Sequence, residues 1–132
     1  MRIHVTYTGG TIGMVDSPRG LVPGADQESR FDAVLKEAGG SIGSISLTAL
    51  SPLIDSSDAT PESWQRIIDD LRASASEADA FVVLHGTDTM AHTCAALSYA
   101  LTDLGRPVVV TGSQLPLGAV GSDAAPNIAG AL

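Results

Sequence analysis

Two short runs of threonine, glycine and aspartate are the residues of this chain best suited to chemistry. One is Thr8-Gly9-Gly10-Thr11-Ile12-Gly13, and the other is His85-Gly86-Thr87-Asp88-Thr89. Their glycines let the backbone approach a ligand closely. A threonine hydroxyl becomes a nucleophile when a base takes its proton and oriented donors hold the developing oxyanion. Two such runs facing each other would therefore favour nucleophilic chemistry.

Each run follows a segment with the pattern of a β-strand. Residues 3–8 alternate apolar and polar side chains, and residues 80–84 are apolar throughout, as in a strand buried on both faces. The second run opens an expected helix whose apolar stripe is Met90, Cys94, Leu97, Leu101 and Leu104. Thr87 or Asp88 could simply cap that helix, but a second run of the same kind favours a site. Open α/β sheets bind their ligands at such strand exits.

The rest of the chain predicts further strands and helices. Strands are expected over residues 44–50 and 108–111, and helices over residues 26–38, from the Thr60-Pro61-Glu62 start, and from Ser122 or Asp123 through Ile128. This pattern predicts an α/β fold over residues 1–132, with an open, mostly parallel sheet and helices on both faces, flavodoxin- or Rossmann-like. If the strand order is 2-1-3-4, the two runs flank the crevice where the strand order reverses.

The loops after the second and fourth strands also carry small polar side chains. Residues 52–58 include Ser56 and Ser57, and residues 112–117 include Ser113. These groups could bind the charged ends of an amino acid, or they could be ordinary turn residues. Residues 14–23 are rich in turn formers and are interpreted as a mobile flap over the first run, with a plain surface turn as the alternative.

Composition narrows the classes of partner and chemistry. Seven Lys and Arg against 15 Asp and Glu give a net charge of -8, which argues against nucleic acid or an anionic membrane as partner. Cys94 is the only cysteine and is expected on the buried helix stripe, which disfavours a catalytic thiol. His4, His85 and His92 lack partners at metal-ligand spacing. Without an apolar leader or a spanning segment, a cytoplasmic protein is expected.

Four segments resemble one enzyme family. Residues 7–14 and 84–90 are similar to the two signatures of the bacterial-type L-asparaginases, and the similarity continues through residues 55–58 and 110–116. It is closest to the cytoplasmic (type I) branch. The resemblance implies hydrolysis of L-asparagine to L-aspartate and ammonia, with no cofactor and no metal. It also implies a homo-oligomer, a dimer or a tetramer, with active sites formed between subunits.

The resemblance assigns roles to individual residues. It implies that Thr11 is the acylated nucleophile and that Thr87 and Asp88 belong to a second catalytic group. The substrate-binding residues that it implies are Ser56, Ser57, Gly86, Asp88 and Ser113. The two serines would hold the α-carboxylate of the substrate, Asp88 would also meet its α-ammonium group, and Ser113 would lie beside its side-chain amide.

The sequence departs from the family pattern in two places. The flap tyrosine of the family falls where this chain has Leu21. The catalytic lysine of the family and its smaller C-terminal domain lie beyond Leu132, so the chain is expected to be the N-terminal domain, cut within a helix. Lys36, on an outward helix face, is no substitute. A glutaminase, an amidotransferase-type subunit and a non-catalytic remnant stay open as alternatives. A nucleotide- or phosphate-binding module is disfavoured because the glycine run does not match G-x-G-x-x-G.

Overall fold

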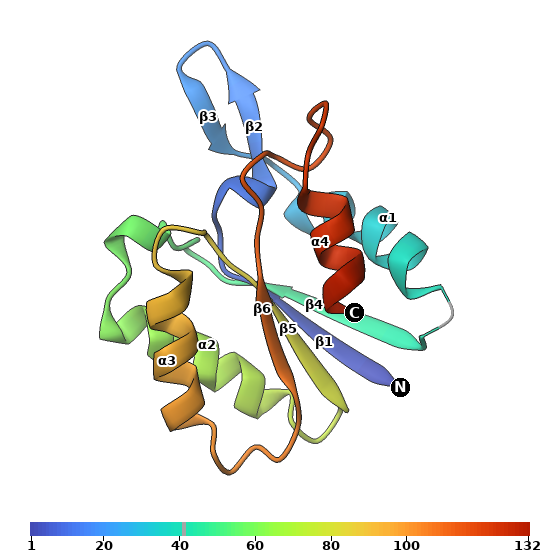
Figure 1. The fold of residues 1–132 in the computed structure, drawn as a ribbon, viewed down its shortest axis with the longest axis vertical. Helices are drawn as coiled ribbons and strands as arrows, with labels where there is room; N and C mark the ends of the chain where they lie inside the picture. Colours follow the sequence, from blue (N-terminus) through green and yellow to red (C-terminus); the bar gives the residue numbers. More distant parts are fainter. Residues whose placement is uncertain (41) are drawn as a thin grey trace.

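A parallel sheet forms the centre of the molecule (Figure 1). Within residues 1–40 and 42–132, which the computed structural model describes, its strands are β1 (Arg2–Tyr7), β4 (Ser44–Ala49), β5 (Ala80–Leu84) and β6 (Val108–Thr111). Their order is β4-β1-β5-β6, and each neighbouring pair is parallel. The predicted order 2-1-3-4 is therefore confirmed, and the strand order reverses between the adjacent strands β1 and β5.

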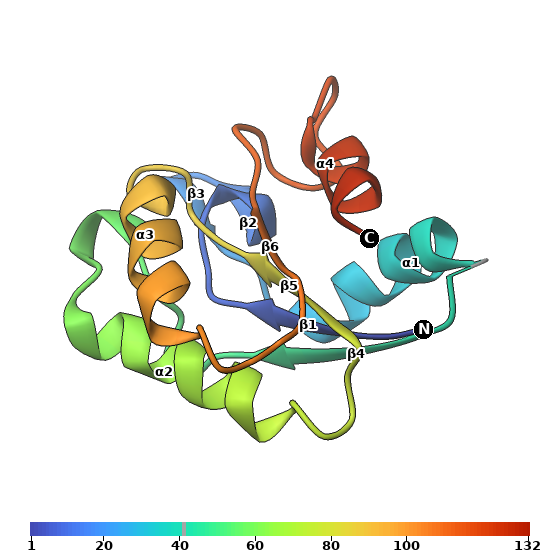
Figure 2. The same cartoon turned by 60° about the horizontal axis from the view of Figure 1, so that its bottom comes forward.

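Helices cover both faces of the sheet, as predicted (Figure 2). Helices α1 (Gln27–Gly39) and α4 (Ala124–Ala131) pack on one face, and α2 (Pro61–Ala73) and α3 (Met90–Ala100) pack on the other. Helix α2 begins at the predicted position, where the Thr60 backbone N–H donates to Ser63 Oγ at 3.2 Å. No helix in the described part of the chain is long and apolar enough to cross a membrane.

Strand β5 is buried on both faces, as its unbroken apolar sequence predicts. Val82 and Leu84 pack in the layer with α1 and α4, whereas Phe81 and Val83 pack in the layer with α2 and α3. All four side chains are at most 2% exposed. Burying this much apolar surface on either side makes β5 the centre of the core and fixes where its exit loop begins.

The four strands end level with one another at one edge of the sheet. Tyr7 pairs with both Ala49 and Leu84, and Leu84 pairs with Thr111. The strand pairing continues one step beyond β5, because the His85 N–H donates to the Thr111 carbonyl at 2.8 Å. The loops that follow these strands therefore gather at the carboxyl edge, where the site was expected.

Residues 14–23, the segment interpreted as a flap, form a β-hairpin, which the sequence analysis did not predict. Strands β2 (Met14–Ser17) and β3 (Gly20–Pro23) pair antiparallel, and Ser17 Oγ closes the turn by donating to the Gly20 carbonyl at 2.7 Å. The hairpin projects from the rest of the molecule at the top of Figure 1. Each strand has only four residues, which are too few for an alternating pattern to stand out in the sequence.

The buried side of α3 differs from the predicted stripe, so the prediction of a buried Cys94 is wrong. Cys94 is exposed, whereas Thr93 is fully buried and Leu97 is 3% exposed. Thr93 Oγ1 accepts a hydrogen bond from Trp64 Nε1 at 3.1 Å and bonds His85 Nε2 at 3.0 Å. Leu97 and Leu101 of the predicted stripe are buried, so the difference is that Thr93 takes the place of Cys94, and apolar periodicity could not anticipate its polar contacts.

Candidate active site

The two glycine runs meet backbone to backbone at the carboxyl edge of the sheet. A Cβ atom on Gly10 would lie 2.5 Å from the Cα atom of Gly86, so a larger residue does not fit there. Gly10 also has a φ of +86°, a left-handed conformation that favours glycine. Thr11 and Thr87 directly follow these glycines, the former in the 3-10 turn η1 (Thr11–Gly13). The structure therefore places the two candidate threonines on touching turns.

The loop after β4 packs against the same glycines. Gly9, with a φ of +136°, lies against the carbonyl of Ile54. Ser56 is 3% exposed, and its Cβ lies only 2.7 Å from where a Cβ on Gly86 would be. The Ser56 carbonyl accepts a hydrogen bond from Thr89 Oγ1 at 2.7 Å, which ties this loop to the start of α3. Three strand exits thus converge on Gly86.

Three polar side chains at these strand exits are available to bind a ligand. They belong to Thr11, Thr87 and Asp88. Among the residues that the structure describes, none is hydrogen-bonded to the two threonine hydroxyls or to the Asp88 carboxylate. By contrast, the neighbouring Thr8 Oγ1 donates to the Leu84 carbonyl at 3.0 Å. Asp88 is exposed and the two threonines are half-buried. A ligand at this edge can therefore meet two hydroxyls and a carboxylate.

Ser57 is turned toward its own loop. Its Oγ and its backbone N–H donate to Asp55 Oδ1 at 2.8 and 3.0 Å, at the start of the 3-10 turn η2 (Ser56–Asp58). These two bonds hold the pKa of the Asp55 carboxyl below its ordinary value. The Ser57 hydroxyl has to leave Asp55 before it can donate to a carboxylate ligand.

The loop after β6 is held by the residue that precedes α4. The Asp123 carboxylate accepts from the backbone N–H groups of Gln114 and Leu115, each at 3.0 Å, and these bonds lower the pKa of Asp123. Ser113 lies at the predicted edge and is 2% exposed, but its hydroxyl donates to the Leu115 carbonyl at 2.6 Å. Of the two residues expected at the start of α4, Ser122 accepts a hydrogen bond from the Ala124 N–H at 3.1 Å, whereas Asp123 makes no side-chain cap and supports this loop instead.

A hydrogen-bond network that sequence reasoning missed holds the second glycine run. Its side chains are Trp64, Thr93 and His85. Trp64 Nε1 can only donate, and it donates to Thr93 Oγ1. The Thr93 hydroxyl can then donate to His85 Nε2 at 3.0 Å, which leaves His85 Nδ1–H to donate to the Gly86 carbonyl at 2.6 Å. Burial lowers the pKa of His85, which favours the neutral ring that this arrangement requires. The network fixes the plane of the peptide that leads into Thr87.

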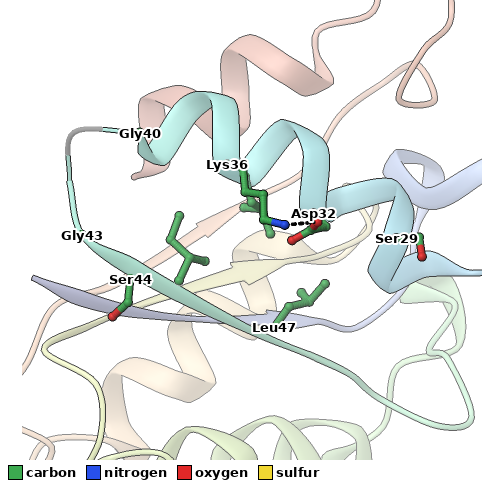
Figure 3. A pocket seen from close by; sticks show the side chains of 9 residues that line it. Ser29, Asp32, Lys36, Gly40, Gly43, Ser44 and Leu47 are labelled. Carbon is green, nitrogen blue, oxygen red and sulfur yellow. Dashed lines mark hydrogen bonds and ion pairs between the residues drawn. The ribbon is translucent and has the colours of Figure 1, made fainter.

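A cavity of about 680 Å³ lies elsewhere, between α1 and the first half of β4 (Figure 3). None of the predicted site residues lines it. Lys36 Nζ and Asp32 Oδ2 form an ion pair at 2.6 Å at its rim, with both side chains exposed. Lys36 therefore lies away from the candidate site, as expected, and it is already paired.

Comparison with known proteins decides the family. The family model for the asparaginase N-terminal domain matches residues 2–132. The chain belongs to the asparaginase family. It is 47% identical over 131 residues to L-asparaginase 1 of Escherichia coli strain K12, which covers 98% of this chain and 39% of that protein. The resemblance carried by the two glycine runs is thereby confirmed.

Solved asparaginase structures share the fold. L-asparaginase I from Vibrio cholerae matches with a TM-score of 0.89 and 42% identity over 99% of this chain and 39% of its own. The thermostable L-asparaginase from Thermococcus kodakarensis matches with a TM-score of 0.73 and 32% identity over 97% of this chain and 38% of its own. This asparaginase-family chain thus spans about 39% of the length of these relatives. Across the described residues, no three His, Cys, Asp or Glu side chains are grouped to hold a metal ion.

Proposed function

We propose that this chain supplies the threonine nucleophile for hydrolysis of L-asparagine to L-aspartate and ammonia. The observation that supports the proposal is the backbone contact between Gly10 and Gly86, because the turns in contact there are the ones that carry Thr11 and Thr87. A nucleophilic hydroxyl needs a nearby group to take its proton, and Thr87 and Asp88 offer a hydroxyl and a carboxylate. The similarity to proteins named L-asparaginase supports the same substrate.

In the proposed reaction, Thr11 Oγ1 attacks the side-chain amide carbon of asparagine. Its proton passes toward Thr87 and Asp88 as the C–O bond forms, and a proton is delivered to the departing nitrogen as the C–N bond breaks and ammonia leaves. Water then hydrolyses the resulting ester, which releases aspartate and restores the threonine hydroxyl. The proposed reaction needs no cofactor or metal.

The proposed substrate contacts come from the loops that converge on Gly86. Asp88 faces the α-ammonium group of the amino acid, and Ser56 and Ser57 donate to its α-carboxylate. Ser113 lies beside the side-chain amide. Substrate entry therefore includes rotation of the Ser57 hydroxyl away from Asp55, which breaks the bond from Oγ and leaves the bond from the Ser57 N–H in place.

The proposed assembly, when the chain is complete, is a cytoplasmic homo-oligomer, a dimer or a tetramer. Its support is apolar surface on the α3 and β6 side of the chain, where Tyr99 is 85% exposed and Val109 is 41% exposed. Sedimentation velocity of the purified protein at several concentrations tests this proposal. A monomer at all concentrations would contradict it.

Ammonia release tests the proposed reaction. The purified protein is assayed with L-asparagine and, separately, with L-glutamine, which distinguishes the two amides. We expect release from asparagine that Thr11→Ala abolishes and Thr11→Ser partly preserves, since serine retains a hydroxyl. Thr102→Ala, at an exposed position after α3, is the matched control and should leave the rate unchanged. Equal rates for the parent protein and Thr11→Ala would refute the role of Thr11.

A further inference from the structure

The carbonyl of Gly13, at the end of the Thr11–Gly13 turn, receives three hydrogen bonds. The donors are the Gly24 N–H at 3.1 Å, Gln27 Nε2 at 3.0 Å and Arg30 Nη1 at 2.7 Å. Gly24 follows the hairpin, while Gln27 and Arg30 stand one turn apart at the start of α1. The Gly13 carbonyl therefore links the Thr11 turn to the base of the hairpin and to helix α1.

The second terminal nitrogen of Arg30 extends this junction to a third segment. Arg30 Nη2 donates to the Leu117 carbonyl at 3.3 Å and to the Met14 carbonyl at 3.4 Å. The Leu117 N–H in turn donates to the Ile12 carbonyl at 3.1 Å. Leu117 belongs to the loop between β6 and α4, the same loop that carries Ser113. The guanidinium thus links the turn of Thr11 to two of the loops around the candidate site.

The chemistry of this junction suits arginine specifically. A guanidinium presents several donors in a rigid, planar fork, whereas a lysine ammonium is a single point from which three separated carbonyls cannot be reached together. The ion pairs found among the described residues do not include Arg30, so its recorded partners are backbone carbonyls. Gly13 is buried, and a Cβ on Gly24 would collide with Arg30 Nη1. Loss of the fork would remove one of the three donors at the Gly13 carbonyl and the donor that the Met14 and Leu117 carbonyls share.

We infer that Arg30 is a positioning residue for the proposed reaction: it holds the Thr11 turn, the hairpin base and the Leu117 loop in one arrangement at the site. This inference rests on the proposed role of Thr11. A nucleophile must stay within a narrow range of positions, and a misplacement of about 1 Å can lower a rate about 100-fold. Arg30 acts through the backbone and does not reach the substrate itself.

The test compares Arg30→Lys, which keeps the charge, and Arg30→Gln, which removes it, with Arg2→Gln as the control. Arg2 is exposed at the start of β1, at the end of the sheet opposite the candidate site, and it pairs with Asp79. We expect both Arg30 variants to lower kcat for asparagine by about 10- to 100-fold with a smaller change in KM. Arg2→Gln should leave both constants unchanged.

Amide hydrogen exchange gives a readout that does not need activity. The N–H groups of Gly24 and Leu117 donate to the Thr11 turn, so their exchange should accelerate in both Arg30 variants and stay unchanged in Arg2→Gln. Circular dichroism identifies a temperature at which each variant is folded. A lower melting temperature with parental kcat and parental exchange at both amides would mean a structural role only and would overturn the inference. A parent protein without amidohydrolase activity would refute the proposed function, and accelerated exchange would still show the positioning of the turn.

Discussion

The backbones of Gly10 and Gly86 are in contact, so the turns that carry Thr11 and Thr87 cannot separate without breaking the packing between two neighbouring strand exits. This contact depends on the absence of side chains at both positions. Gly10 further requires a left-handed backbone at φ +86°. The geometry of the candidate site therefore depends on two glycines, Gly10 and Gly86, which carry no side chain.

Gly10→Ala should destabilise the fold through both effects, and Gly118→Ala separates them. Gly118 has a similar φ of +90°, but a Cβ there would meet no atom within 4 Å. We expect about 1–2 kcal/mol of destabilisation from the left-handed backbone at Gly118. Gly10→Ala should cost about 1–3 kcal/mol more because of overpacking. Urea denaturation measures both, and equal losses in the two variants would show that the Gly10–Gly86 contact is not tight.

Aspartate should bind through Ser56 and Asp88. Because hydrogen bonds to charged groups are worth about 1.5–3 kcal/mol, Ser56→Ala and Asp88→Ala should each weaken binding about 10- to 100-fold. Isothermal calorimetry with L-aspartate measures this. Ser98→Ala, on the exposed face of α3, is the control. Unchanged affinity in both site variants would place the ligand elsewhere.

The tip of the hairpin should be open to proteolysis while its base is held. Arg19 is exposed in the turn, whereas Arg30 is hydrogen-bonded at the base. Trypsin is therefore expected to cut after Arg19 before it cuts after Arg30, and L-aspartate should slow the first cut if the hairpin covers bound ligand. Mass spectrometry of a digestion time course identifies the order. Earlier cleavage after Arg30 would contradict this account of the junction.

Acid should weaken the contact between β1 and α2. Burial tends to raise the pKa of Asp70, but hydrogen bonds from His4 Nε2 at 3.0 Å and Thr6 Oγ1 at 2.5 Å outweigh it, so the pKa is lower than usual. A carboxyl with a lowered pKa in the folded state stabilises the protein above its unfolded pKa, which is about 3.9. That contribution disappears as the pH falls through the lower, folded-state pKa.

The variant Asp70→Asn tests the direction of this pH dependence of stability. The variant should lose about 1–3 kcal/mol of unfolding free energy at neutral pH, and the difference from the parent protein should shrink below about pH 4. Urea denaturation across a pH series measures it. Asp69→Asn, whose side chain bonds the exposed Gln65, is the matched control and should show little change. A difference that grows toward acid would reverse the assignment.

These 132 residues by themselves should hydrolyse asparagine far more slowly than L-asparaginase 1 of Escherichia coli. They span 39% of that protein, and the family resemblance implies that a catalytic lysine lies in the part of the relative that they do not match. Loss of a positioned acid–base group lowers a rate by about 10²–10⁴-fold. Ammonia release from both proteins under the same conditions measures the ratio. Equal rates would show that Thr11, Thr87 and Asp88 suffice.

Sequence alone predicted the parallel sheet, the helices on both faces and, on the condition that the strand order is 2-1-3-4, the meeting of the two glycine runs. These features follow from local rules: apolar periodicity marks the elements, and parallel strands exit at one edge. The same reasoning selected the two runs, residues 8–13 and 85–89, because glycine and hydroxyl residues at strand exits stand out from the apolar runs before them. Within these runs, the family resemblance assigned the roles of Thr11, Thr87 and Asp88.

Only the tertiary structure decided which polar groups are available and which residues hold them in place. The burial of Thr93 in place of Cys94 depends on Trp64 and His85, which lie on other elements. Arg30 lies 87 positions from Leu117, and the two meet only because α1 and the loop before α4 reach the same edge. Hydrogen bonds of this kind have no period in the sequence. They depend on the direction of individual side chains, which is set only when the helices have packed on the sheet.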